Sequence, residues 1–203
     1  MERTSVHKLA RVLRVMVIVI FVCNILALFF VPMLAVAQRT SAGTGAVEWG
    51  LDILKSLFNP KLDPETRSEV FAWLGYMFTL SWPAVFEEAY TAVLTLFLWA
   101  CGVCTAVILW QGKRVLDTIL KGEPFSVENA ANLRRAAVCC FVISGAALAR
   151  LVWGFAAYRS ILPLLTYNAL FVPVFLVGGL LFLVMSALFR QAAELKAEND
   201  LTI

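Results

Sequence analysis

The amino-acid sequence predicts an all-α integral membrane protein, a bundle of four membrane-spanning helices that forms a single domain over residues 1–203. Composition is the first observation: 61% of the residues are hydrophobic and 15% are charged, whereas water-soluble chains carry about 45–50% apolar and about 25% charged residues. The second is that four stretches reach the length of about 20 apolar residues that a helix needs to cross a bilayer. Together they exclude a disordered tail, a coiled coil and a soluble enzyme.

The four predicted spans cover about residues 15–37, 89–110, 136–157 and 169–189. None contains Asp, Glu, Lys or His, and Arg150 is the only ionised side chain inside them. The uncharged segment 70–86 is interrupted by Pro83, and only Glu87 and Glu88 separate it from the second span, which leaves no room for a turn in water. We therefore predict that 70–86 is interfacial or re-entrant.

The distribution of Lys and Arg predicts the orientation, because basic residues near span ends favour the cytoplasm. Eleven lie on one side: Arg3, Lys8, Arg11, Arg14, Lys113, Arg114, Lys121, Arg134, Arg135, Arg190 and Lys196. Five lie on the other: Arg39, Lys55, Lys61, Arg67 and Arg159. We expect both termini and the segment 111–135 to be cytoplasmic.

The first span has an alternative interpretation as a cleaved secretion signal. A basic start, an apolar run and the small-residue pattern Ala35-Val36-Ala37 are typical of such signals. The run is longer than the about 7–15 residues of a signal core, which favours a retained helix. A purified protein that begins at Gln38 would contradict four spans.

The external segment 38–88 is predicted to contain two helices. Val47, Leu51, Leu54 and Phe58 share one helical face beside polar residues, which indicates a short amphipathic helix on the bilayer. Asp63 followed by Pro64 is typical of the start of a second helix.

The cytoplasmic segment 111–135 is predicted to be a helical hairpin. An apolar stripe continues past the second span through Leu116 and Leu120. Gly122 can end that helix, Pro124 and Phe125 make the turn, and Ser126 is placed to N-cap the next helix.

The run Gly122-Glu-Pro124-Phe125-Ser-Val-Glu-Asn129-Ala-Ala-Asn-Leu133-Arg134, together with the ending Glu198-Asn-Asp-Leu-Thr-Ile203, resembles the bacterial membrane family catalogued as domain of unknown function 2975. The external segment is longer and less typical. The resemblance implies the bacterial cytoplasmic (inner) membrane. It also implies a role in membrane-linked regulation, because members are often encoded beside a small helix-turn-helix transcription regulator.

Arg150 is the residue in the spans that most suggests a binding site, since an intramembrane charge is costly and usually faces a partner or a cavity. It borders a face of small residues that lets another helix approach closely: Ala136, Cys140, Ser144, Ala147 and Gly154. We expect Arg150 to reach outward and anchor the bundle. The alternatives are a buried ion pair, with Glu87 or Glu88 as the plausible partner and Asn24 as a second possibility, or a ligand site.

Catalytic and metal-binding constellations are missing from the sequence. The spacing Cys101-Gly-Val-Cys104 has no second pair or nearby His in the sequence, so we interpret the cysteines as packing residues. We expect no enzyme activity, no metal and no cofactor.

By elimination we expect a contact protein, regulatory or sensory, whose partner surface comprises Gly122, Pro124, Phe125, Asn129 and Arg134. The expected partners are the lipid bilayer, a cytoplasmic protein such as a small helix-turn-helix regulator, and further copies of the chain. Direct contact with nucleic acid is not expected. The alternative function is a small oligomeric channel or transporter subunit.

Overall fold

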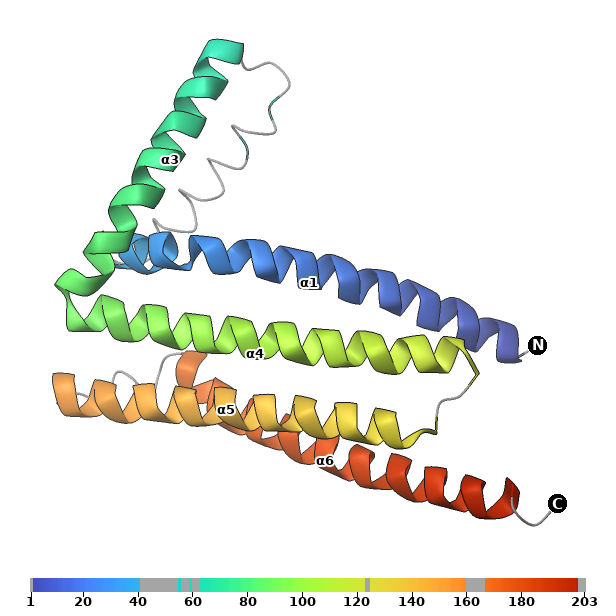
Figure 1. Ribbon diagram of the computed structural model, residues 1–203. Helices are drawn as coiled ribbons and strands as arrows, with labels where there is room; N and C mark the ends of the chain where they lie inside the picture. The colour runs from blue at the N-terminus through green and yellow to red at the C-terminus, as the bar shows by residue number, and fades with distance from the viewer. Residues whose placement is uncertain are drawn as a thin grey trace. The chain divides into compact units, whose positions relative to one another are not determined.

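The computed structural model describes residues 2–40, 55, 59, 63–122, 125–159 and 167–200, and every regular element within these ranges is a helix (Figure 1). The elements are α1 (Glu2–Thr40), α3 (Pro64–Glu87), α4 (Ala89–Leu120), α5 (Val127–Tyr158) and α6 (Tyr167–Asp200). Within the described ranges α1, α4, α5 and α6 are long and apolar enough to cross a membrane. The predicted all-α class with four spanning helices is confirmed.

The chain forms two compact units. The first comprises residues 1–26 and 100–203, and the second comprises residues 27–99. Helices α1 and α4 each contribute one part to each unit.

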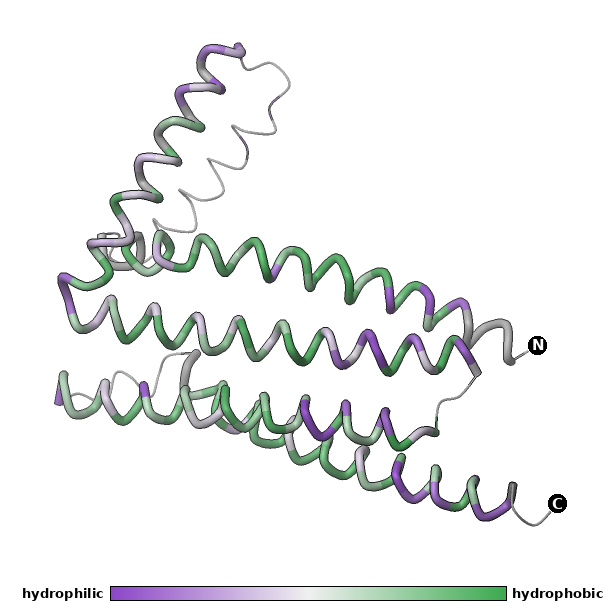
Figure 2. Tube along the Cα trace, in the orientation of Figure 1, coloured by the Kyte–Doolittle hydropathy of each residue, from purple (hydrophilic) through white to green (hydrophobic). Residues whose placement is uncertain are grey.

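In the first unit, α4 and α5 extend well beyond the predicted spans. Gly122 ends the turn after α4 with φ of 84°, and its N–H donates to the carbonyl of Ile119 at 3.1 Å. Ser126 caps α5, because its hydroxyl accepts the N–H of Asn129 at 3.2 Å. Figure 2 shows that hydrophilic residues gather at the start of α1, the end of α4, the start of α5 and the end of α6. The hydrophilic residues at these ends therefore bound the apolar spans, and the helices continue past them.

The core of the first unit lies along one face of α5. Ala136, Ile143 and Ala147 are between 0% and 3% exposed. Helices α5 and α6 lie side by side (Figure 1). The Ser144 hydroxyl donates to the carbonyl of Val172 at 2.9 Å, and the Ser186 hydroxyl donates to that of Ala130 at 2.7 Å. The small residues thus allow the close approach of helices that the sequence predicts.

The second unit contains α3, the end of α1 and the start of α4. Asp63 precedes α3 and Pro64 opens it, as the sequence predicts. Residues 70–86 belong to this one continuous helix, with Pro83 inside it. Glu88 alone, in an extended conformation, separates α3 from α4. The predicted amphipathic helix over 47–58 lies outside the described residues, apart from Lys55.

Candidate functional site

The charged end of the first unit joins α1 to α4 through an ion pair. The Arg14 Nε lies 2.8 Å from the Asp117 Oδ1, and the Lys113 Nζ lies 3.9 Å from the Asp117 Oδ2. The Lys113 ammonium also lies 4.9 Å from the centre of the Trp110 ring, which in turn contacts Phe21 with ring centres 5.7 Å apart. Two aromatic rings and three charged groups thus mark the change from apolar to polar side chains on these helices.

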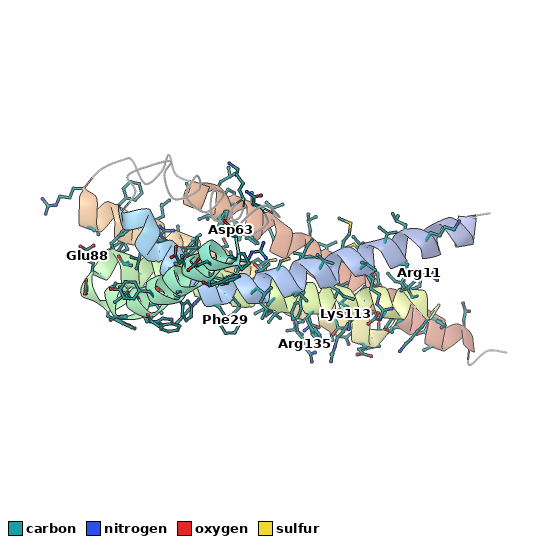
Figure 3. The ribbon with its side chains drawn as sticks, turned by 90° about the horizontal axis from the view of Figure 1, so that it is seen from above. Arg11, Phe29, Asp63, Glu88, Lys113 and Arg135 are labelled. Atoms are coloured by element: carbon teal, nitrogen blue, oxygen red, sulfur yellow. The ribbon has the colours of Figure 1, made fainter. Side chains whose placement is uncertain are left out.

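The turn between α4 and α5 exposes apolar side chains next to basic ones. Phe125 is 50% exposed and Val127 is 62% exposed. The Phe125 ring contacts that of Phe189 on α6, with centres 5.6 Å apart, which holds the turn against the bundle. Lys121 and Gly122 before the turn, and Arg134 and Arg135 on α5, are also exposed. Figure 3 labels Arg135 of α5, Arg11 of α1 and Lys113 of α4, which all belong to the first unit. Pro124 lies outside the described residues.

Asn129 is buried, whereas we expected it on the partner surface. Its side chain is 0% exposed, and its Nδ2 donates to the Thr118 hydroxyl at 2.6 Å. That hydroxyl donates to the carbonyl of Val115 at 2.8 Å. Asn129 therefore ties α5 to α4 inside the bundle, and of the expected partner surface Gly122, Phe125 and Arg134 are the described members that remain exposed.

Two further buried carboxamides were not singled out from the sequence. Asn132 is 0% exposed and Gln111 is 8% exposed. A signal for Asn132 was present, because the small-residue face of α5, continued toward its N-terminus from Ala136 at helical spacing, passes through Asn132 and Asn129. No comparable pattern pointed to Gln111, which follows Trp110 at the end of the predicted span.

The other predicted site residues are divided between the two units. Arg150 on α5 is partly exposed and lies near the buried Ala147 and Gly154. Asn24 on α1 is also partly exposed, and its Oδ1 is buried without a hydrogen-bond partner among the described residues. Glu87 and Glu88 are exposed and lie in the second unit. The pairing of Arg150 with one of them stays a prediction.

The cysteines of α4 and α5 come together in the first unit. All five cysteines of the chain are thiols, and the thiol of Cys104 lies near that of Cys139. Thiols of two helices thus lie near each other, which the spacing within the sequence did not indicate. Even so, the described residues contain no group of three or more His, Cys, Asp or Glu that could hold a metal ion.

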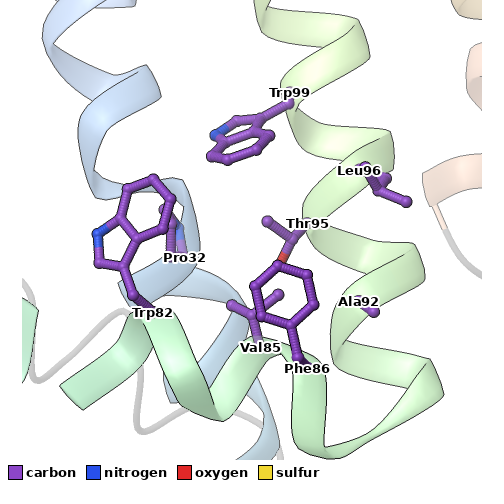
Figure 4. A pocket seen from close by; sticks show the side chains of 8 residues that line it. All are labelled: Pro32, Trp82, Val85, Phe86, Ala92, Thr95, Leu96 and Trp99. Atoms are coloured by element: carbon purple, nitrogen blue, oxygen red, sulfur yellow. The ribbon is translucent and has the colours of Figure 1, made fainter. Parts of the chain in front are cut away.

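An aromatic pocket of about 60 Å³ lies in the second unit (Figure 4). It is lined by Pro32, Trp82, Val85, Phe86, Ala92, Thr95, Leu96 and Trp99. Two of its polar groups are paired within the protein: the Thr95 hydroxyl donates to the Thr91 carbonyl at 2.8 Å, and the Trp99 Nε1 donates to the Leu28 carbonyl at 3.2 Å. The pocket offers packing surface and no group for chemistry.

A family model described as "Protein of unknown function (DUF2975)" matches residues 63–203. The match begins just before α3 and includes the turn with Phe125, the buried Asn129 and Asn132, and α6. Residues 1–62, with the long external segment, lie outside it. Neither a curated protein nor a solved structure matches the chain.

Proposed function

The chain belongs to the DUF2975 family of proteins of unknown function, and from this premise we propose that it acts by binding a cytoplasmic protein at the turn between α4 and α5. In this proposal it is a non-enzymatic, multi-pass protein of the bacterial cytoplasmic membrane. Both termini and the turn face the cytoplasm, in keeping with the excess of Lys and Arg at those span ends.

The observation that carries the proposal is the exposure of Phe125 and Val127, 50% and 62%. The turn that holds them follows Lys113, Arg114 and Lys121, which mark the end of the apolar stretch of α4. Exposed apolar groups rimmed by polar residues are typical of protein contacts. Arg134 and Arg135 on the next helix favour a partner with an acidic surface, because charge complementarity steers and orients association.

The family resemblance favours a small helix-turn-helix regulator as the partner. Holding such a protein at the membrane requires contact and no catalytic group, which agrees with the scarcity of catalytic constellations in the sequence. Regulation would then follow from a change in the fraction of the partner that is bound at the membrane.

A photo-crosslinking amino acid placed at Phe125 in native membranes tests the proposal. The matched control position is Leu195 on α6, which is 64% exposed. We expect a crosslink from Phe125 to a cytoplasmic protein, identified by mass spectrometry as a regulator encoded next to the chain's own gene, and none from Leu195. Purified regulator should then bind the membrane protein in lipid nanodiscs.

The Arg134→Glu, Arg135→Glu double variant should abolish this crosslink. Its control is Arg190→Glu, which changes an exposed charge on α6 and should leave the crosslink intact. Crosslinks from Phe125 that reach only lipid or other copies of the chain would refute the proposal.

A further inference from the structure

A groove of about 260 Å³ lies between α1 and α4 in the first unit. It is lined by Val17, Ile18, Phe21 and Val22 of α1 and by Leu109, Trp110 and Lys113 of α4. Ile18, Val22 and Trp110 are exposed. The groove therefore opens away from the bundle core, on the surface of two helices that are long and apolar enough to cross a membrane. In a bilayer such a surface meets lipid hydrocarbon.

Basic side chains lie at one end of this groove. Lys113 is the last wall residue along α4, and its ammonium lies 4.9 Å from the centre of the Trp110 ring. Arg14 lies one turn before the wall residues of α1 and on the same helical face. Because α1 and α4 are antiparallel, Arg14 and Lys113 lie at the same end. The groove thus runs from an apolar end at Val22 and Leu109 to a basic end.

Positive charge exceeds negative charge at the basic end. The Asp117 carboxylate is shared between two cations, with its Oδ1 2.8 Å from the Arg14 Nε and its Oδ2 3.9 Å from the Lys113 Nζ. Arg11, one turn before Arg14, and Arg114, next to Lys113, add two exposed cations. A single carboxylate does not balance these charges, so this end of the groove attracts an anion.

We propose that the groove binds an acyl chain of an anionic phospholipid, such as phosphatidylglycerol, whose phosphate lies at the basic end. The open apolar wall suits an acyl chain, which needs no hydrogen-bond partner, and the phosphodiester supplies the negative charge. A zwitterionic phospholipid fits the apolar wall equally well, but the cation of its head group opposes the attraction. Basic pockets between membrane helices bind anionic head groups in other proteins. The site does not depend on the proposed cytoplasmic partner.

Trp110 reports on the groove, because bromine atoms on an acyl chain quench the fluorescence of a tryptophan that they touch. The full chain is placed in nanodiscs of phosphatidylcholine that contain the same small fraction of either brominated phosphatidylglycerol or brominated phosphatidylcholine. The quenching of Trp110 is the difference between the wild type and Trp110→Phe. We expect phosphatidylglycerol to be enriched at the groove by about fivefold, the effect of one basic residue near anionic lipid, and therefore to quench Trp110 more strongly.

Variants of the basic end separate this site from a general attraction of anionic lipid to the charged end of the unit. The Lys113→Gln, Arg114→Gln double variant should remove the preference for phosphatidylglycerol, whereas Lys113→Arg keeps the cation and should retain it. The matched control is the Arg190→Gln, Lys196→Gln double variant, which removes two exposed cations of α6 and should also retain the preference. Should the first double variant fail to fold, Arg11→Gln, at an exposed position of α1, should lower the preference.

Three results would overturn the proposal. Equal quenching of Trp110 by the two brominated lipids in the wild type would mean that the groove does not select the head group. An equal loss of preference in the α4 and α6 double variants would assign the effect to diffuse surface charge. Absence of quenching by either lipid would mean that protein covers the groove, for example a second copy of the chain.

Discussion

The Asp117 carboxylate of α4 lies 2.8 Å from the Arg14 guanidinium of α1 and fixes these two helices at their charged ends. Their side chains are 28% and 42% exposed, so water screens the pair only in part. We expect Asp117→Asn to lower the free energy of unfolding in detergent by about 0.5–1 kcal/mol. In a double-mutant cycle with Arg14→Gln, the coupling free energy should account for most of this loss of unfolding free energy.

The matched control for this pair lies on α6. Arg190 and Glu194 are 2.9 Å apart but 70% and 56% exposed, and both belong to one helix. Glu194→Gln should cost less, about 0.2–0.5 kcal/mol. Equal losses of unfolding free energy in the Asp117 and Glu194 variants would mean that the contact between Arg14 and Asp117 stabilises the protein no more than an exposed pair within one helix does.

Asn129 is expected to be one of the most sensitive positions of the turn region. Asn129→Ala removes a buried hydrogen bond and leaves the Thr118 hydroxyl without its donor, at a cost of about 1–3 kcal/mol in unfolding free energy. Thr118→Val removes the hydroxyl that accepts from the Asn129 Nδ2 and should cost a similar amount, while the double variant should cost less than the sum. Gln191→Ala, at an exposed position of α6, should be neutral. A neutral Asn129→Ala would show that this bond does not hold α5 to α4.

Gly178 and Gly179 are neighbours on α6 with opposite expected responses to alanine. A Cβ at Gly179 would lie 2.8 Å from a ring carbon of Phe141 on α5, whereas one at Gly178 meets nothing within 4 Å. Gly179→Ala should destabilise the protein by about 1–3 kcal/mol through overpacking. Gly178→Ala should stabilise it by up to about 1 kcal/mol, because alanine favours the helix.

A rescue experiment separates steric clash from other effects at Gly179. Adding Phe141→Leu to Gly179→Ala shortens the opposing side chain and should recover part of the lost stability. Thermal unfolding of both variants in one detergent measures it. If Phe141→Leu worsens Gly179→Ala, the contact between α5 and α6 at this point is not the cause.

The proposed orientation is tested with reporters of compartment. A green fluorescent protein fused after Ile203 should fluoresce and an alkaline phosphatase there should be inactive, since the C-terminus is expected in the cytoplasm. The same pair inserted after Arg159, between α5 and α6, should give the reverse. Identical results at the two sites would contradict a spanning α6.

Local chemistry in the sequence predicted the ends of helices well. Ser126 caps α5 and Gly122 ends the turn after α4, as predicted. Capping depends on residues within one turn of the helix end, so the local sequence contains this information. The burial of α5 through Ala136 and Ala147 was likewise predictable, since a stripe of small residues indicates a close neighbour.

Properties that depend on which helices meet could not be predicted in this way. Asn129 was expected on the partner surface as part of the turn region, but Thr118 of α4 provides it with a buried partner. Cys104 and Cys139 are 35 positions apart in the chain, and nothing in either local pattern indicates their proximity. The carboxamides of Gln111 and Asn132 are buried only because neighbouring helices cover them, and neither local pattern indicates those neighbours.

The polar content of α5 has a consequence for how the chain enters the membrane. Of the four spanning helices it has the lowest mean hydropathy, and its buried face includes Asn129, Asn132 and Ser144. A segment with these groups partitions into lipid less readily by itself than α1, α4 or α6. During synthesis α5 should therefore remain at the translocon until α4 and α6 cover that face, which makes its integration a joint event of three helices.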